Sequence, residues 1–159
     1  MAIPKTARSA PGKRSIFLSY AWGDDSSESA RQREQVVEGL CLKLAAESWE
    51  VVRDKTAMRV GDEISAFMKR ITRADLVIVV LSDKYLHSPY CMAELYGIYQ
   101  RAQGDKADFL EHIVPLTLAD AKFATWQERA ALAEHWQAEC EEMEKSLKHL
   151  GGEDFQLYK

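Results

Sequence analysis

The sequence predicts an α/β domain of the flavodoxin-like type, with a parallel β-sheet covered by helices on both faces and a long C-terminal helix. Short apolar segments alternate with segments of helical spacing along the chain, and residues 75–82 include six consecutive apolar side chains. A run of this kind is typical of a strand that is buried on both faces at the centre of a parallel sheet. Right-handed crossovers between such strands place helices on both faces.

The composition fits one domain and limits its partners. A chain of 159 residues with a net charge of -4 is large enough for one core, and its acidic balance argues against a nucleic-acid partner. No apolar run reaches the ~20 residues of a membrane span, so we expect a cytoplasmic protein. Three cysteines without a C-x-x-C pair, and histidines without ligand spacing, predict neither a disulfide framework nor a metal site. We expect a disordered leader at 1–13, the domain at 14–150, and a linker or truncated tail at 151–159 that leads into a longer chain.

The first half of the domain is expected to hold two strands and two helices. Residues 15–20 form an apolar run rich in aromatic and branched side chains, which predicts the first strand. Helix 28–46 follows, and residues 49–54 are the second strand. Gly61 and the capping acid Asp62 precede a second helix over residues 63–74. The apolar stripe of the first helix consists of Val36, Val37, Leu40, Cys41, Leu44 and Ala45.

The second half continues the alternation. After the strand at 75–82, Ser88 is a suitable N-cap, and Pro89 occupies the first helical position, where its missing N–H does no harm. This helix is expected to end at about Arg101, and the fourth strand is expected at 112–118. A fifth strand is not evident after Leu118.

A long helix is predicted from Trp126 to Leu150. Its apolar residues step by three or four along one seam, and the other faces are charged. The seam fits either packing on the sheet of its own domain or contact with a partner helix. We favour packing, because tryptophan is common in intramolecular packing and the seam is only about three heptads long.

Several common site types are absent from the sequence. It has no G-x-G-x-x-G after the first strand, no phosphate-binding G-x-x-x-x-G-K-[ST] loop and no G-x-S-x-G nucleophile elbow. The first and third predicted strands end in Ser19-Tyr20 and Leu81-Ser82, without the acids of a phospho-accepting receiver domain.

Glu94 is the one acid in an otherwise apolar helix start, "HSPYCMAELYGIY". It shares a helix face with Tyr90 and projects at the border between the core and the solvent. Spacing alone leaves two interpretations open, a functional carboxylate or a glutamate that merely flanks the buried face. The buried stripe beside it is expected to consist of Cys91, Leu95, Ile98 and Ala102.

The motifs taken together resemble the TIR domain, the Toll/interleukin-1 receptor module, over about residues 14–120. They are "IFLSYAWGD", "VVRDKTAMRVGDEI", "ADLVIVVLSDKYLHSPYCMAEL" and "IVPLTL", in the family's order. Many bacterial and plant members of the family cleave NAD+, whereas receptor and adaptor members are scaffolds. The catalytic glutamate of the enzymatic members lies in S-x-W-C-x-x-E-L, and Glu94 occupies that position here, with Tyr90 in place of the tryptophan.

The resemblance implies a TIR-domain NAD+ glycohydrolase. Its products would be nicotinamide and ADP-ribose or a cyclic ADP-ribose, with NAD+ as the substrate and no cofactor or metal. Glu94 would stabilise the positive charge that develops on the ribose. Other residues at family positions would bind the substrate, although each also has an ordinary structural explanation as a core, edge or turn residue: Tyr20, Trp22, Asp54, Ser82 and Tyr90.

The resemblance also implies partners. The loop 55–61, with Lys55, Arg59 and Gly61, matches the loop that TIR domains use for self-association, so we expect activation in a homo-oligomer or filament, in immune or antiphage signalling. Two alternatives remain, a TIR–TIR interaction scaffold without enzymatic activity and an unrelated flavodoxin-like domain that binds flavin.

Overall fold

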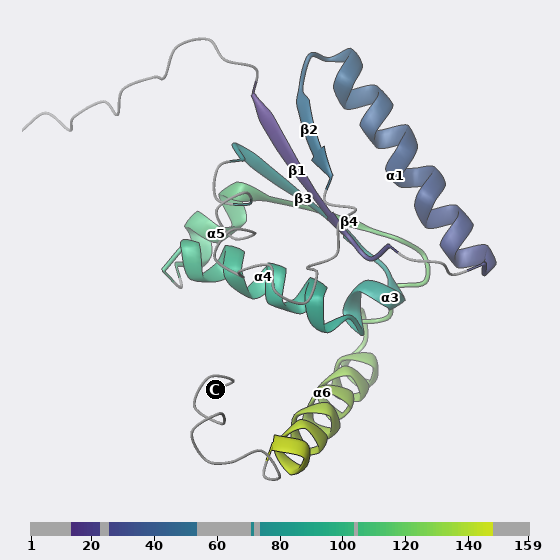
Figure 1. Cartoon of the computed structure of the whole chain (residues 1–159), viewed down its shortest axis with the longest axis vertical. Helices are drawn as coiled ribbons and strands as arrows, with labels where there is room; N and C mark the ends of the chain where they lie inside the picture. Colours follow the sequence, from purple (N-terminus) through teal and green to yellow (C-terminus); the bar gives the residue numbers. More distant parts are fainter. Residues whose placement is uncertain (1–13, 23–25, 54–70, 72–73, 104, 148–159) are drawn as a thin grey trace, which may run out of the picture. The chain divides into compact units, whose positions relative to one another are not determined.

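The computed structural model describes residues 14–22, 26–53, 71, 74–103 and 105–147 (Figure 1). It divides into two compact units, Met1–Asp120 and Ala121–Lys159, each of which is described by itself. The elements of the first unit in chain order are β1 (Ser15–Tyr20), α1 (Glu28–Ala46), β2 (Glu50–Arg53), β3 (Leu76–Leu81), α3 (Asp83–Leu86), α4 (Pro89–Arg101), α5 (Lys106–His112) and β4 (Ile113–Thr117).

The four strands form one parallel sheet in the order β2-β1-β3-β4. β3 is an inner strand, which confirms the prediction from its unbroken apolar run. In the register of β1 against β3, Ser19 lies opposite Val79 and Tyr20 opposite Val80. All four strands therefore end at the same edge of the sheet, the edge at which open α/β sheets bind ligands.

The side chains of the strands alternate between two cores, one on each face of the sheet. Phe17 and Val79 belong to the core that α3, α4 and α5 cover, whereas Leu18 and Val80 belong to the core that α1 covers. Figure 1 shows the same arrangement, with α1 on one side of the strands and α4 and α5 on the other. Helices on both faces were predicted, and the structure confirms them.

The two longest helices of this unit begin where the sequence predicts. The Ser27 hydroxyl accepts a hydrogen bond from the backbone N–H of Ala30 at 3.1 Å, which caps α1. The Ser88 hydroxyl caps α4 in the same way, and Pro89 is its first residue. The predicted apolar stripe of α1 is wrong at two positions, because Val36 and Ala45 are exposed.

Two short helices were not predicted. α3 has 4 residues and α5 has 7, so neither is long enough to show a helical period in the sequence. Local capping defines them instead. Ser82 caps α3, and the Asp105 carboxylate accepts hydrogen bonds from the N–H groups of Ala107 at 2.8 Å and Asp108 at 3.1 Å to cap α5.

The second unit holds α6, Trp126–Leu147. The prediction of a long C-terminal helix is confirmed for these residues, while residues 148–150 of the predicted helix lie outside the described part of the chain. A fifth strand was not evident after Leu118, and residues 118–125 of the structure are indeed not in a strand. How the apolar seam of α6 packs stays a prediction.

A capping box begins α6. The Thr125 N–H donates to the Glu128 carboxylate at 2.9 Å, and the Glu128 N–H donates to the Thr125 hydroxyl at 3.2 Å. The hydrogen bond from the Thr125 backbone lowers the pKa of Glu128. A carboxyl whose pKa is lowered by folding stabilises the folded form above its unfolded pKa, and this stabilisation is lost as the pH falls through the folded value.

We therefore expect Thr125→Ala to reduce helix content, and Glu128→Gln to weaken the dependence of helix content on pH in the acidic range. The loss of an N-cap hydroxyl typically costs about 1 kcal/mol of helix stability. Far-ultraviolet circular dichroism over an acid titration measures both effects. Gln127→Ala is the matched control, since Gln127 is an exposed residue inside the same turn. Equal curves for Thr125→Ala and the wild type would contradict this account of the helix start.

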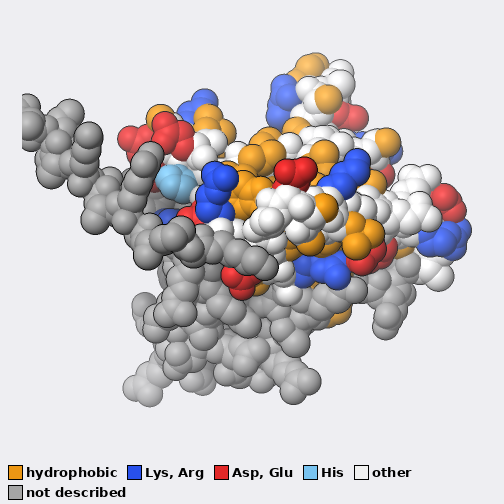
Figure 2. Space-filling model, turned by 90° about the horizontal axis from the view of Figure 1, so that it is seen from above, with side chains coloured by type: hydrophobic (Ala, Val, Ile, Leu, Met, Phe, Trp, Pro, Cys, Tyr) orange, Lys and Arg blue, Asp and Glu red, His pale blue; other side chains and the backbone are white. Residues whose placement is uncertain are grey.

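The described surface carries charges of both signs. Figure 2 shows Lys, Arg, Asp and Glu side chains interspersed with apolar ones on one face of the molecule. The described residues include no helix that combines the length and apolar content needed to cross a bilayer.

Candidate functional site

The Glu94 carboxylate lies at the carboxyl end of the sheet, on the side that α4 covers. Its residue is half-buried, as predicted for a position between the core and the solvent. The Ser19 hydroxyl donates a hydrogen bond of 2.5 Å to Glu94 Oε2. Ser19 is the penultimate residue of β1 and is 1% exposed, so the sheet itself fixes the donor.

Tyr85 completes a buried chain of hydroxyls behind Glu94. Its phenol oxygen lies 3.0 Å from Ser19 Oγ, and the residue is 0% exposed. Burial raises the pKa of Tyr85, which keeps the phenol protonated and able to donate. A serine hydroxyl has a single proton to donate, and Ser19 donates it to the Glu94 carboxylate. The hydrogen bond between Tyr85 and Ser19 therefore runs from the Tyr85 hydroxyl to Ser19 Oγ.

This arrangement pre-positions the carboxylate. One oxygen of Glu94 accepts a hydrogen bond from Ser19 on the rigid strand β1. Ser19 is in turn held by Tyr85, a residue of α3 whose ring is buried in the core. Charge-assisted hydrogen bonds of this kind are shorter and stronger than neutral ones. The site therefore presents a fixed acceptor of positive charge or of a proton at the end of the sheet where ligands bind.

Ser82 contributes to the site indirectly. It follows β3 and is 0% exposed, and its hydroxyl accepts a hydrogen bond from the backbone N–H of Tyr85 at 3.1 Å. This bond caps α3 and sets the position of the tyrosine that supports Ser19. The predicted contact of Ser82 with substrate stays a prediction.

The aromatic residues of the prediction lie in different environments. Tyr20 is 4% exposed on the face of the sheet that α1 covers, and its hydroxyl has no hydrogen-bond partner in the described part of the chain. Burial, and then the Glu34 carboxylate, raise the pKa of Tyr20. Trp22 is 37% exposed after β1, and Tyr90 is 56% exposed in the first turn of α4. The two exposed rings leave aromatic surface for a ligand, and the buried one does not.

The remaining predicted residues fall outside the described part of the chain. They are the substrate-binding candidate Asp54 and the residues of the self-association loop, Lys55, Arg59 and Gly61.

Cys91 lies one helical turn before Glu94, on the buried face of α4. It is 4% exposed, and burial raises the pKa of its thiol to about 11. A thiol with a raised pKa stabilises the fold below its unfolded pKa of about 8.5, and this stabilisation is lost as the pH rises toward the folded value. Little thiolate is present at neutral pH, so Cys91 is an inert core residue.

We expect iodoacetamide at slightly alkaline pH to modify Cys91 only after unfolding. Cys41 in α1 is half-buried and serves as the internal comparison, with faster modification expected in the folded protein. Peptide mapping by mass spectrometry, with and without denaturant, measures both sites. Rapid modification of Cys91 in the folded chain would show that the core beside Glu94 is more open than described.

The sequence interpretation missed Ser19 and Tyr85. A serine near the end of β1 and a tyrosine shortly after β3 carry no sequence motif of their own. Their partnership depends on the pairing of β1 with β3, which only the fold reveals.

The structure also contains a pocket beside α1. It has a volume of about 440 Å³, and its described lining includes none of the predicted site residues. It is lined by Ser29, Gln32, Gln35, Val36, Leu118, Ala119 and Asp120.

Comparisons with known proteins agree with the fold. The family model for the TIR domain matches residues 16–145. A solved structure of the activated Roq1 resistosome directly recognising the pathogen effector XopQ contains TIR domains that are similar to this chain. Their TM-score is 0.56 at 22% sequence identity, and the match covers 79% of this chain and 72% of that one. A comparison with curated proteins finds no match. Because the family model spans most of the sequence, this chain belongs to the TIR domain family.

Proposed function

We propose that the chain is a TIR-domain NAD+ glycohydrolase in which Glu94 is the catalytic carboxylate. The family includes NAD-cleaving enzymes, and Glu94 stands at their glutamate position in S-x-Y-C-x-x-E-L. The observation that carries the proposal is the hydrogen bond of 2.5 Å from Ser19 to Glu94. A glutamate that merely flanked a helix would not need a buried donor on the neighbouring strand.

The chemistry needs only one well-placed carboxylate. The bond between C1′ of the ribose and the pyridinium nitrogen breaks, and its electron pair leaves with the nitrogen, so nicotinamide departs neutral and needs no proton. Positive charge develops on the ribose as an oxocarbenium ion, which the ionised Glu94 stabilises by charge attraction. Water then attacks C1′ and loses a proton to give ADP-ribose, or a nitrogen of the adenine attacks to give a cyclic product.

The substrate would lie across the carboxyl ends of β1 and β3. Tyr90 shares the face of α4 with Glu94 and would wall the ribose pocket with its exposed ring, and Trp22 would stack on a base. Asp54 completes the proposed substrate-binding set, while the buried Tyr20 and Ser82 would support it from within the fold. NAD+ is the proposed substrate, with no metal or cofactor.

We further propose that self-association activates the enzyme. The solved structure with similar TIR domains is an activated resistosome, and the proposed contact of this chain is the loop with Lys55, Arg59 and Gly61. The proposed setting is cytoplasmic immune or antiphage signalling, in which further domains of a longer chain would control assembly. A pocket completed by assembly would leave the monomer weakly active.

The test is nicotinamide release from NAD+ at high protein concentration with a crowding agent. Wild type is compared with Glu94→Ala, and light scattering verifies that both proteins associate equally. We expect release from the wild type alone. Equal turnover in the two proteins, or none in either while both associate, contradicts the proposal and favours the scaffold alternative.

A further inference from the structure

Arg33 is a buried arginine for which the described part of the chain offers no ion-pair partner. It lies in α1 and is 1% exposed, and its Nε and Nη2 atoms are buried with no hydrogen-bond partner in the described part of the chain. Arginine is almost never fully buried unless it is paired, because an uncompensated buried charge is strongly destabilising. A guanidinium kept in this state needs an explanation beyond packing.

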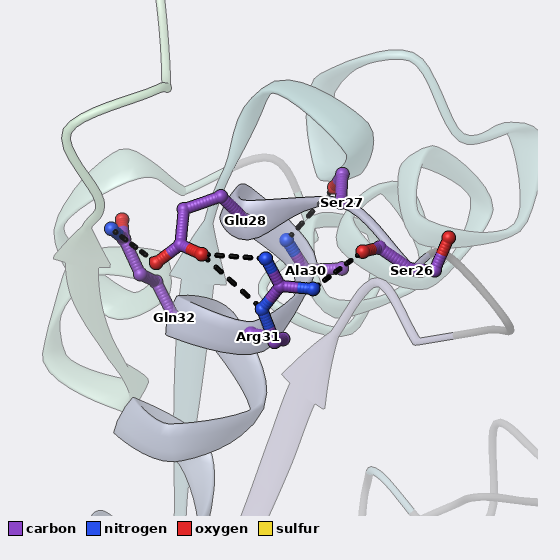
Figure 3. Close-up of polar contacts among 6 residues, drawn as sticks. All are labelled: Ser26, Ser27, Glu28, Ala30, Arg31 and Gln32. Carbon is purple, nitrogen blue, oxygen red and sulfur yellow. Dashed lines mark hydrogen bonds and ion pairs between the residues drawn. The ribbon is translucent and has the colours of Figure 1, made fainter.

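The same helix shows what a satisfied arginine looks like. Arg31 has a side chain that is 60% exposed, and it bonds to the Glu28 carboxylate at 2.7 Å and to the Ser26 carbonyl at 2.8 Å (Figure 3). Glu38, another acid of α1, is engaged by Arg53 at 2.8 Å. Two acids of α1, Glu28 and Glu38, thus form ion pairs with arginines other than Arg33.

The position of Arg33 relates it to the candidate site. It falls between Ala30 and Val37 on the buried stripe by which α1 contacts the sheet, in the half of the helix that follows the end of β1. Because α1 begins shortly after β1 ends, its first half, which holds Arg33, lies near the edge of the sheet where ligands bind (Figure 1).

The geometry points to Arg33 as the receptor for a phosphate group of the ligand, and in the proposed function this group is the pyrophosphate of NAD+. The two unpartnered atoms are adjacent on the guanidinium and form the planar fork that binds two phosphate oxygens at once. Two residues would then hold the nicotinamide-bearing half of the dinucleotide. Glu94 would contact its ribose, and Arg33 would bind its pyrophosphate. This inference rests on the proposed function for the identity of the substrate.

Burial of Arg33 gives the inference a kinetic consequence. At 1% exposure the guanidinium must turn outward, or its cover must shift, before an anion reaches it. Binding that requires such a change is slower than a simple encounter. We expect the association rate of ADP to fall below about 10⁵ M⁻¹s⁻¹, the lower end of the usual range.

The experiment uses ADP, which carries a pyrophosphate and has no nicotinamide bond to break. Calorimetry on the whole chain compares wild type, Arg33→Gln and the matched surface control Arg31→Gln. We expect Arg33→Gln to weaken ADP binding at least about tenfold, as expected for the loss of a charge-assisted bidentate contact, and Arg31→Gln to bind like the wild type. Adenosine, which lacks phosphate, should bind the wild type and Arg33→Gln equally. Equal ADP affinity in the wild type and Arg33→Gln overturns the inference, as does an ADP affinity of the wild type no greater than its adenosine affinity.

Thermal unfolding distinguishes a ligand-binding role of Arg33 from a structural one. It also keeps the inference testable if Arg33→Gln folds poorly. Without ligand, Arg33→Met should melt no lower than the wild type, because it removes an unpaired buried charge. ADP should raise the melting temperature of the wild type and not that of Arg33→Met. A lower melting temperature with an unchanged ADP response would mean that Arg33 is a structural residue and overturns the inference. ADP binding requires no NAD+ cleavage, so this result and the Glu94 assay can fail independently.

Discussion

Glu94→Gln is expected to lower the rate of nicotinamide release by at least about 100-fold while leaving the fold intact. Glutamine keeps the size of the side chain and its acceptor oxygen for Ser19, and it removes only the charge. Loss of one preorganised electrostatic group commonly costs 10²–10³ in rate. The effect should appear in kcat rather than KM, because charge on the ribose develops only in the transition state.

The measurement is steady-state nicotinamide release by the assembled protein. Glu111→Gln, at an exposed position of α5, is the matched control for the loss of a negative charge elsewhere and should retain wild-type activity. If Glu94→Gln and Glu111→Gln were equally active, the carboxylate would have no role in the chemistry.

Ser19→Ala is expected to affect both stability and turnover. It removes the donor to Glu94 and leaves the Tyr85 phenol buried without its Ser19 partner. An unsatisfied buried hydroxyl costs about 1–3 kcal/mol, so the free energy of unfolding should fall by that amount. Turnover should fall by about tenfold or more, because a less constrained carboxylate spends less time in the productive geometry.

A double-mutant cycle separates the two effects. Tyr85→Phe removes the orphaned hydroxyl, so the pair Ser19→Ala and Tyr85→Phe should be destabilised by less than the sum of the single changes. Turnover should stay low in the double variant, because the donor to Glu94 is still missing. Urea unfolding and nicotinamide release measure the two quantities. Strict additivity of the unfolding free energies would mean that the contact at 3.0 Å contributes nothing.

Much of the fold is readable from the sequence because its signals are local. The unbroken apolar run of β3, the cap at Ser27 and the Ser88–Pro89 start of α4 each define an element by themselves. α3 and α5 are too short to carry a period, so they were missed. The distribution of helices over the two faces followed from the alternation of strands and helices.

The site is less readable, because its contacts join distant segments. Glu94 was found through family resemblance, whereas Ser19 and Tyr85 meet only after β1 pairs with β3. Arg33 did leave a signal, since it occupies a buried position on the helical stripe of α1 between Ala30 and Val37. A charged residue on an apolar stripe is a better guide to a site than the apolar residues around it.

The function proposed for this TIR domain is cleavage of the nicotinamide–ribose bond of NAD+. The most direct measurement follows NAD+ loss, nicotinamide and ADP-ribose products together by chromatography, with the wild-type chain driven into oligomers. The account predicts one nicotinamide for each NAD+ consumed, matched by linear or cyclic ADP-ribose. Intact NAD+ in the presence of verified oligomers would contradict it.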